Sequence, residues 1–209
     1  MQRNRTLRFV SAFAMLLSAA TIGALSVSSQ AAHPTTAAIG QPAPSFNLPN
    51  VASSKPVSLG SLAQGKKATV VIFVSTRCPV SNAYNERMAE LAKRYEPKGI
   101  SFVGIDSNQN EPVAECASWS AASKLGFPVL KDGNSAIADN YGATHTPEVY
   151  VIDPSGKLVY HGRIDSNMDE ASVTHHDLAD ALNAILAGKP VPVTETKAFG
   201  CSIKRGGGW

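Results

Sequence analysis

The sequence has few cysteines and no run of basic residues, and both shortages limit what the protein can be. Only three of the 209 residues are cysteine: Cys78, Cys116 and Cys201. Three is an odd number, so at least one thiol is unpaired within the monomer, and a chain of this length does not need a disulfide framework for its stability. We therefore interpret the cysteines as groups that perform chemistry rather than as cross-links.

The net charge is also small. The formal value is +3, and residues 1–31 contain Arg3, Arg5 and Arg8 but no acidic residue. Without that segment the chain has 16 basic and 16 acidic residues. A neutral chain without a basic patch has no electrostatic footprint for nucleic acid, so we expect no nucleic-acid partner.

The N-terminal segment has the order of a secretory signal peptide. The arginines precede an apolar run from Phe9 to about Val27, and small residues that include Ser29 and Ala31 follow it. This order predicts a signal peptide over residues 1–31 and secretion across the inner membrane to the periplasm. An uncleaved membrane anchor is the alternative, because the run is close to the minimum length for a spanning helix.

The remainder is expected to form one domain with flanking segments. We interpret residues 32–39 as a linker, residues 40–188 as the folded domain, and residues 189–209 as a C-terminal tail. The tail contains Pro190, Pro192 and three consecutive glycines, so the sequence predicts that it is loosely ordered.

Hydrophobic periodicity within the domain predicts alternating strands and helices. Three apolar runs have the length and composition of buried strands: residues 68–74, 100–105 and 127–130. Three segments have the apolar spacing of one helical face: residues 80–95, 111–125 and 178–188. Two apolar runs around residues 154–156 predict a hairpin. The patterns indicate an α/β fold with a central mixed sheet, helices on both faces and a C-terminal β-hairpin.

Cys78 has the most informative position. It comes four residues after the first strand ends, and Pro79 follows it at the predicted start of a helix. Backbone N–H groups and the positive end of the helix dipole would then face the sulfur, and both favour the nucleophilic thiolate. Arg77 could add positive charge, although its side chain could equally point into solvent. An inert buried cysteine is the alternative.

A second signal is Thr146-Pro147, directly before an apolar strand. Proline cannot donate within a ladder, so this position suits a turn into the strand. We predict a cis Thr146-Pro147 bond, which would place backbone groups beside a reactive sulfur. An ordinary trans proline that opens an edge strand is the alternative.

Together these motifs resemble the thioredoxin-like superfamily, on its alkyl hydroperoxide reductase and thiol-specific antioxidant (peroxiredoxin-like, redoxin) side. The resemblance spans roughly residues 40–204. It rests on four segments: Gly40–Leu48, Ser75–Pro79, Thr146-Pro147 and Ile152–Lys157. It implies a thioredoxin-like fold and thiol-dependent redox chemistry without a cofactor or a metal. It also implies a peroxide or disulfide substrate, and an external thiol or thioredoxin-like protein as reductant.

The peroxiredoxin pattern is incomplete. Peroxiredoxins have Pro-x-x-x-Thr-x-x-Cys, and the corresponding positions hold Val71 and Ser75. The Ser75 hydroxyl could still hydrogen-bond a peroxide oxygen, but the proline is absent. The arginine that peroxiredoxins carry on a later strand falls near Pro147, so Arg77 or Arg163 would have to replace it.

The thioredoxin pattern is incomplete too. Ser81 stands where thioredoxin-type reductases have the second cysteine of Cys-x-x-Cys, so no dithiol cycle can run within that motif. A lone active thiol needs a second thiol to resolve its oxidised form. The candidates are Cys201, which could instead tie down the tail without turnover, and Cys116, which could instead be a small buried helical residue.

Three functional hypotheses follow. The leading one is an exported thiol-dependent oxidoreductase, a peroxiredoxin-like antioxidant, whose Cys78 thiolate attacks a peroxide or a disulfide. The second is a thiol-disulfide exchange protein that acts on other envelope proteins. The third is a non-enzymatic copper-binding or metallochaperone module, with His145, His161 and His175-His176 as candidate ligands beside cysteine. Paired histidines at a helix start are more often exposed than ligating, so we expect no metal.

Overall fold

The structure, a computed structural model, describes residues 36–206, which belong to one compact unit. The predicted signal peptide, residues 1–31, and the first part of the predicted linker lie outside the described residues. Within residues 36–206, no helix combines the length and the apolar composition needed to cross a membrane. The described end of the predicted linker packs on the domain, because Ala37 and Ile39 contact its hydrophobic core.

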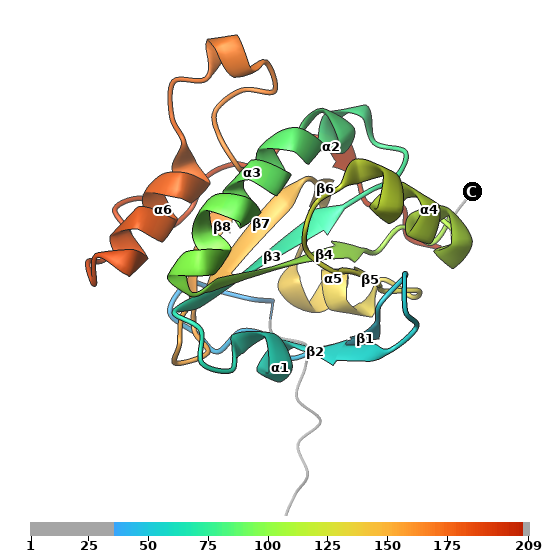
Figure 1. Cartoon of the computed structure of the whole chain (residues 1–209), viewed down its shortest axis with the longest axis horizontal. Helices are drawn as coiled ribbons and strands as arrows, with labels where there is room; N and C mark the ends of the chain where they lie inside the picture. The colour runs from blue at the N-terminus through green and yellow to red at the C-terminus, as the bar shows by residue number, and fades with distance from the viewer. Residues whose placement is uncertain (1–35, 207–209) are drawn as a thin grey trace, which may run out of the picture. The chain divides into compact units, whose positions relative to one another are not determined.

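A five-stranded mixed sheet forms the centre of the domain, in the order β5-β4-β3-β7-β8 (Figure 1). β3 (Ala68–Val74) pairs in parallel with β4 (Ile100–Asp106), which pairs in parallel with β5 (Val129–Lys131). On the other side of β3, β7 (Glu148–Ile152) and β8 (Leu158–Gly162) form the predicted antiparallel hairpin. The mixed sheet and the hairpin are therefore confirmed.

Helices cover both faces of the sheet, as predicted (Figure 1). Every residue of β3 is buried, and alternate residues face opposite sides. Val70 and Ile72 pack with α3 (Asn85–Tyr95), α4 (Val113–Ser123) and α6 (Asp177–Leu186). Val71 and Phe73 pack with the helices of the other face, α1 (Leu59–Ala63) and α5 (Ala136–Tyr141). This double burial explains why the strand reads as one continuous apolar run.

Several smaller elements were not predicted. β1 (Asn47–Pro49) and β2 (Pro56–Ser58) form a short antiparallel hairpin, and η1 (Glu96–Lys98) and η2 (Glu170–Ser172) are 3-10 turns. The helix predicted over residues 80–95 is two helices, because α2 (Pro79–Ala83) ends at Tyr84 and α3 begins at Asn85.

The prediction of a loosely ordered tail is wrong for the part of the tail that the structure describes. β9 (Cys201–Ser202) pairs antiparallel with β6 (His145–Thr146). Further upstream, the backbone of His161 exchanges hydrogen bonds with Thr194 and Thr196. Ala198 and Ile203 are buried. Prolines and glycines lower local propensity, but pairing with β6 and β8 and burial of apolar side chains order this segment.

Candidate active site at Cys78 and Cys201

Cys78 lies where β3 gives way to α2, and it caps that helix. Its side chain is only 2 % exposed. The backbone N–H of Ser81 donates to Cys78 Sγ at 3.3 Å, and the Cys78 thiol donates to the carbonyl oxygen of Thr146 at 3.2 Å. Pro79 occupies the first helical position, which has no intrahelical use for an N–H. The predicted strand-cysteine-proline-helix arrangement is present.

The peptide bond between Thr146 and Pro147 is cis, as predicted. Thr146 also belongs to β6, where its register partner on β9 is Cys201. Thr146 therefore connects the two cysteines: its carbonyl oxygen meets the Cys78 sulfur, and its strand pairs with the one that carries Cys201. Residues far apart in the sequence thus form one dithiol site.

The two thiols are not joined by a disulfide, and each influences the ionisation of the other. Burial opposes ionisation of Cys78, but interactions with the Cys201 thiol, with Thr146 and with the Ser81 N–H outweigh it, and the pKa of Cys78 lies below its ordinary value. The same interaction with Cys78, together with burial, raises the pKa of Cys201. Cys78 is the thiol that ionises first.

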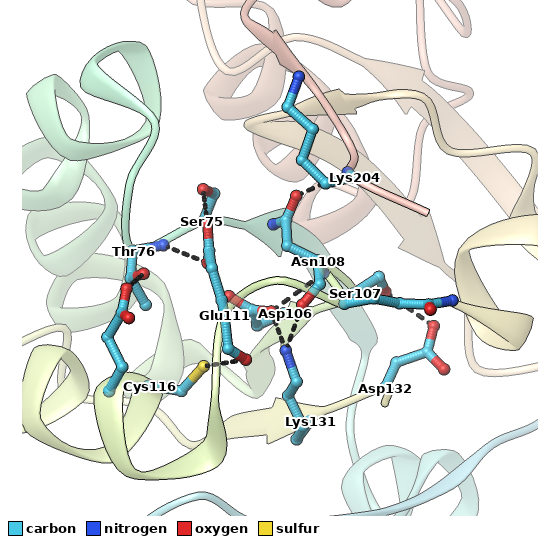
Figure 2. Close-up of polar contacts among 12 residues, drawn as sticks. Ser75, Thr76, Asp106, Ser107, Asn108, Glu111, Cys116, Lys131, Asp132 and Lys204 are labelled. Atoms are coloured by element: carbon cyan, nitrogen blue, oxygen red, sulfur yellow. Dashed lines mark hydrogen bonds and ion pairs between the residues drawn. The ribbon is translucent and has the colours of Figure 1, made fainter. Parts of the chain in front are cut away.

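Backbone contacts hold β9 in this position. A Cβ atom on Gly200 would overlap the carbonyl oxygen of Thr146, so only glycine allows so close an approach. The N–H of Ile203 donates to the carbonyl of Thr144 at 2.9 Å. The N–H of Lys204 donates to Asn108 Oδ1 at 2.9 Å (Figure 2), and the carbonyl of Lys204 accepts from the N–H of Gln109 at 2.8 Å.

A buried glutamate, Glu111, holds the loop that precedes Cys78 (Figure 2). The Ser75 hydroxyl donates to Glu111 Oε1 at 2.6 Å, and the N–H of Thr76 donates to Oε2 at 2.8 Å. Ser75 Oγ in turn accepts the N–H of Cys78 at 3.0 Å. The single hydroxyl proton of Ser75 is thus given to Glu111, which leaves the hydroxyl no proton to donate to a peroxide oxygen.

A buried ion pair supports the same loop from behind. Lys131 Nζ lies 2.6 Å from Asp106 Oδ1 and 2.7 Å from the carbonyl oxygen of Asn108 (Figure 2). Burial and the neighbouring Glu111 raise the pKa of Asp106 to about 8. Burial opposes ionisation of Glu111 too, but its interactions with Asp106 and Ser75 outweigh burial and lower its pKa. Of the two carboxyls, Asp106 therefore takes up a proton at the higher pH, and Glu111 stays ionised.

Cys116 lies beside this cluster and is completely buried. Burial and the charge of Asp106 raise the pKa of its thiol to about 12, which suits an inert thiol. Asp106, Glu111 and Cys116 have metal-capable atoms within 4.8 Å of one another, but the ammonium of Lys131 already supplies a cation to Asp106. The surroundings favour the interpretation of Cys116 as a packing residue over a resolving one.

A second buried glutamate, Glu148, holds the loop before Pro147. Its Oε2 accepts the N–H groups of Thr144 and His145, both at 2.8 Å. Its Oε1 contacts His161 Nε2 at 2.7 Å and accepts the Tyr150 hydroxyl at 3.0 Å. These contacts, with His161 foremost, outweigh burial and lower the pKa of Glu148.

Sequence reasoning missed both glutamates. The available signal for Glu111 was the polar run that follows the buried strand β4, since the carboxyl ends of the parallel strands β3 and β4 lie at the same sheet edge. The available signal for Glu148 was its charge, because it is a carboxylate at the start of an otherwise apolar strand.

The arginines proposed as partners of the active thiol are paired elsewhere. Arg77 Nε lies 2.8 Å from Glu115 Oε1, on an exposed part of the surface. Arg163 Nε lies 2.7 Å from Asp177 Oδ2. Arg77 thus follows the alternative of a side chain directed to the surface, where it pairs with Glu115.

Three comparisons with known proteins agree with this geometry. The family model described as AhpC/TSA family matches residues 39–161. The thiol:disulfide interchange protein DsbE of Haemophilus influenzae is 28% identical over 138 residues, which cover 65% of this chain and 70% of the relative. The thiol-disulfide oxidoreductase ResA of Bacillus anthracis is 28% identical over 121 residues, which cover 58% of this chain and 67% of the relative.

Among solved structures, an uncharacterized conserved protein from Geobacillus kaustophilus superposes with a TM-score of 0.76 at 32% identity, over 82% of this chain and 94% of that protein. The family model alone matches more than half of the chain. With its mixed sheet, its cis-proline loop and a cysteine at a helix start, the chain belongs to the AhpC/TSA family of the thioredoxin-like fold and is related to thiol-disulfide oxidoreductases.

Proposed function

We propose that the protein is a thiol-disulfide oxidoreductase that cycles between a Cys78–Cys201 dithiol and the corresponding disulfide, and that it exchanges with disulfides rather than reducing peroxides. The observation that carries this proposal is the pairing of β6 with β9, which brings Cys201 beside the Cys78 thiol. Two electrons would pass between this pair and the dithiol or disulfide of a partner, through a mixed disulfide that the second cysteine releases.

The surroundings of Cys78 favour exchange over peroxide reduction. The peroxiredoxin proline is replaced by Val71, and the Ser75 hydroxyl donates its proton to Glu111. Arg77 and Arg163 are ion-paired with carboxylates away from the sulfur. The relatives named DsbE and ResA point in the same direction.

The test is to equilibrate the protein in glutathione redox buffers and to map its disulfides by mass spectrometry. We expect one disulfide, Cys78–Cys201, that forms as a single two-electron couple while Cys116 stays reduced. The variant Cys116→Ala should behave like the wild type. Failure to form the Cys78–Cys201 bond at any buffer ratio would refute the proposal.

Peroxide consumption with a dithiol reductant separates the two chemistries. We expect equal rates for the wild type and for Cys78→Ser, while turnover of a disulfide substrate is lost in the variant because no second thiol releases the mixed disulfide. Peroxide consumption that depends on Cys78 and exceeds disulfide exchange would replace this proposal with a peroxidase.

We further propose that residues 1–31 are a signal peptide and that the protein works in the periplasm, as a thioredoxin-like domain with a docked C-terminal segment. Its reductant would be an external thiol or a thioredoxin-like partner. The order of the N-terminal residues and the relationship to DsbE and ResA support this. The intact mass of the protein recovered from the envelope should begin near residue 32.

A further inference from the structure

We propose that partner thiols exchange with Cys201, and that Cys78 is the internal thiol that makes and breaks the bond to Cys201. The inference rests on the proposed dithiol cycle and adds to it which sulfur the partner touches. The sequence predicts that Cys78 is the thiol that reacts with the partner, because it stands at the position of the active cysteine in the family's motif. The structure reverses the two roles.

Access to the two sulfurs differs. Cys78 is 2 % exposed and lies against Thr146, at the strand that β9 covers, whereas Cys201 is partly exposed on β9 itself. Thiol-disulfide exchange needs the attacking sulfur to reach the sulfur it bonds to. A partner can reach Cys201 with β9 in place, but it can reach Cys78 only if β9 leaves.

The contacts of β9 oppose such a departure. Directly after the two-residue strand, hydrogen bonds join Ile203 to Thr144 and Lys204 to the loop at Asn108. Phe199 packs against the hydrophobic core, and its ring lies 6.3 Å from that of Tyr84. Loss of this docking would expose apolar surface and leave backbone groups without partners.

The leaving groups also differ. Attack at Cys201 expels Cys78, whose thiolate keeps the Ser81 N–H as a hydrogen-bond donor and whose pKa is lowered. Attack at Cys78 would expel Cys201, whose pKa is raised. Since the thiol of lower pKa leaves faster, access and leaving-group chemistry favour the same direction.

A positive charge lies near the accessible sulfur. Lys204 is exposed and acts electrostatically on the Cys201 thiol. An incoming thiolate is an anion, so the charge on Lys204 favours its approach to Cys201. We therefore expect an anionic thiol such as glutathione to react well at this sulfur.

Reduction of the Cys78–Cys201 disulfide proceeds in two steps. A reductant thiolate bonds to Cys201 Sγ, the bond between Cys201 and Cys78 breaks, and its electron pair leaves on Cys78. A second reductant thiolate then attacks the reductant's sulfur in the mixed disulfide, a reductant disulfide leaves, and Cys201 takes up a proton from solvent. In the reverse direction, the Cys78 thiolate attacks Cys201 Sγ and expels the partner as a thiolate.

The experiment starts from Cys116→Ala protein in which the Cys78–Cys201 disulfide has been verified by mass spectrometry. Glutathione is added, samples are quenched with acid at increasing times, and the thiols are then alkylated and the protein digested. The expected early species carries glutathione on Cys201 and the alkyl label on Cys78, in at least about tenfold excess over the opposite arrangement. Lys204→Gln should slow this reaction with glutathione more than with a neutral thiol.

Single-cysteine variants provide a second readout. With glutathione disulfide, Cys78→Ser should give a stable adduct on Cys201, and Cys201→Ser should form an adduct on Cys78 more slowly. Glutathione found on Cys78 in equal or larger amounts, starting from the verified disulfide, would overturn this inference and leave the dithiol cycle intact. If the starting disulfide cannot be formed, the proposed function itself fails and this inference falls with it.

Discussion

Two buried glutamates, one in each active-site loop, hold the backbone around the sulfurs. Glu111 accepts the Ser75 hydroxyl and the Thr76 N–H in front of Cys78, and Glu148 accepts the N–H groups of Thr144 and His145 before the cis-proline. A buried carboxylate that accepts several N–H bonds stays ionised and fixes the donors in place. The rigidity of the site therefore depends on residues that do not touch the reacting atoms.

The raised pKa of Asp106 gives a prediction for stability. Its pKa of about 8 in the folded protein lies above the value of an exposed aspartate. Between about pH 4 and 8 the folded state thus holds a proton on this carboxyl that the unfolded state lacks. The stability that Asp106 contributes is fully present below this range and is lost as pH rises through it, by up to about 1.4 kcal/mol per pH unit. Asp106→Asn should flatten this slope in urea denaturation of the reduced protein.

The control for that measurement is Glu86→Gln, which removes an exposed carboxylate on α3. This variant should keep the wild-type slope. The informative quantity is the slope rather than the stability itself, because Asp106→Asn also weakens the pairing with Lys131. A wild-type slope in Asp106→Asn would contradict the assignment of the proton to Asp106.

At the residue level, the sequence was sufficient where chemistry follows from local order. Cys78 and Pro79 could be placed at a helix start, and the cis bond before Pro147 could be predicted, since each depends on its immediate neighbours. The choice between Cys116 and Cys201 stayed open. It depends on which segment docks beside Thr146, and that is a long-range contact.

At the level of elements, the pairing of β6 with β9 brings the two cysteines together. Gly200→Ala would place a methyl group on the carbonyl oxygen of Thr146 and push β9 away. We expect the effective concentration of Cys201 at Cys78, and with it the rate of disulfide formation, to fall about tenfold or more. Quenched-flow alkylation after addition of an oxidant measures this rate.

Gly133→Ala is the matched control, because a Cβ atom at Gly133 meets no atom within 4 Å. Its rate of disulfide formation should equal that of the wild type. A wild-type rate in Gly200→Ala would mean that the close approach of β9 to Thr146 is not what brings the sulfurs together.

The elements also show where sequence patterns stop being informative. The apolar runs of β3 and β4 predict buried strands, because double burial leaves a continuous apolar signature. The docked tail has no such signature: β9 is two residues long and follows a glycine. Its order comes from hydrogen bonds to β6 and to the loop at Asn108, so no local pattern could predict it.

At the scale of the whole molecule, the proposed disulfide would link residues that are 123 positions apart. A cross-link that closes so long a loop lowers the entropy of the unfolded chain and is worth about 4–5 kcal/mol of stability when it causes no strain. We expect the free energy of unfolding to rise by several kcal/mol on oxidation of the wild type. Urea denaturation of both redox forms measures this difference.

Cys201→Ser treated with the same oxidant should show no such gain. If oxidation leaves the stability of the wild type unchanged, the disulfide either strains the folded protein or does not link Cys78 to Cys201. Disulfide mapping of the same sample distinguishes these two outcomes.

The position of Cys201, 123 residues after Cys78, also affects biogenesis. Synthesis proceeds from the N-terminus, so Cys78 and Cys116 are both made well before Cys201 is available. In the folded domain Cys116 is completely buried, which withdraws its thiol from pairing with either of the other two. The pair proposed to carry the redox chemistry is thus complete only after β9 has been made and has docked on β6.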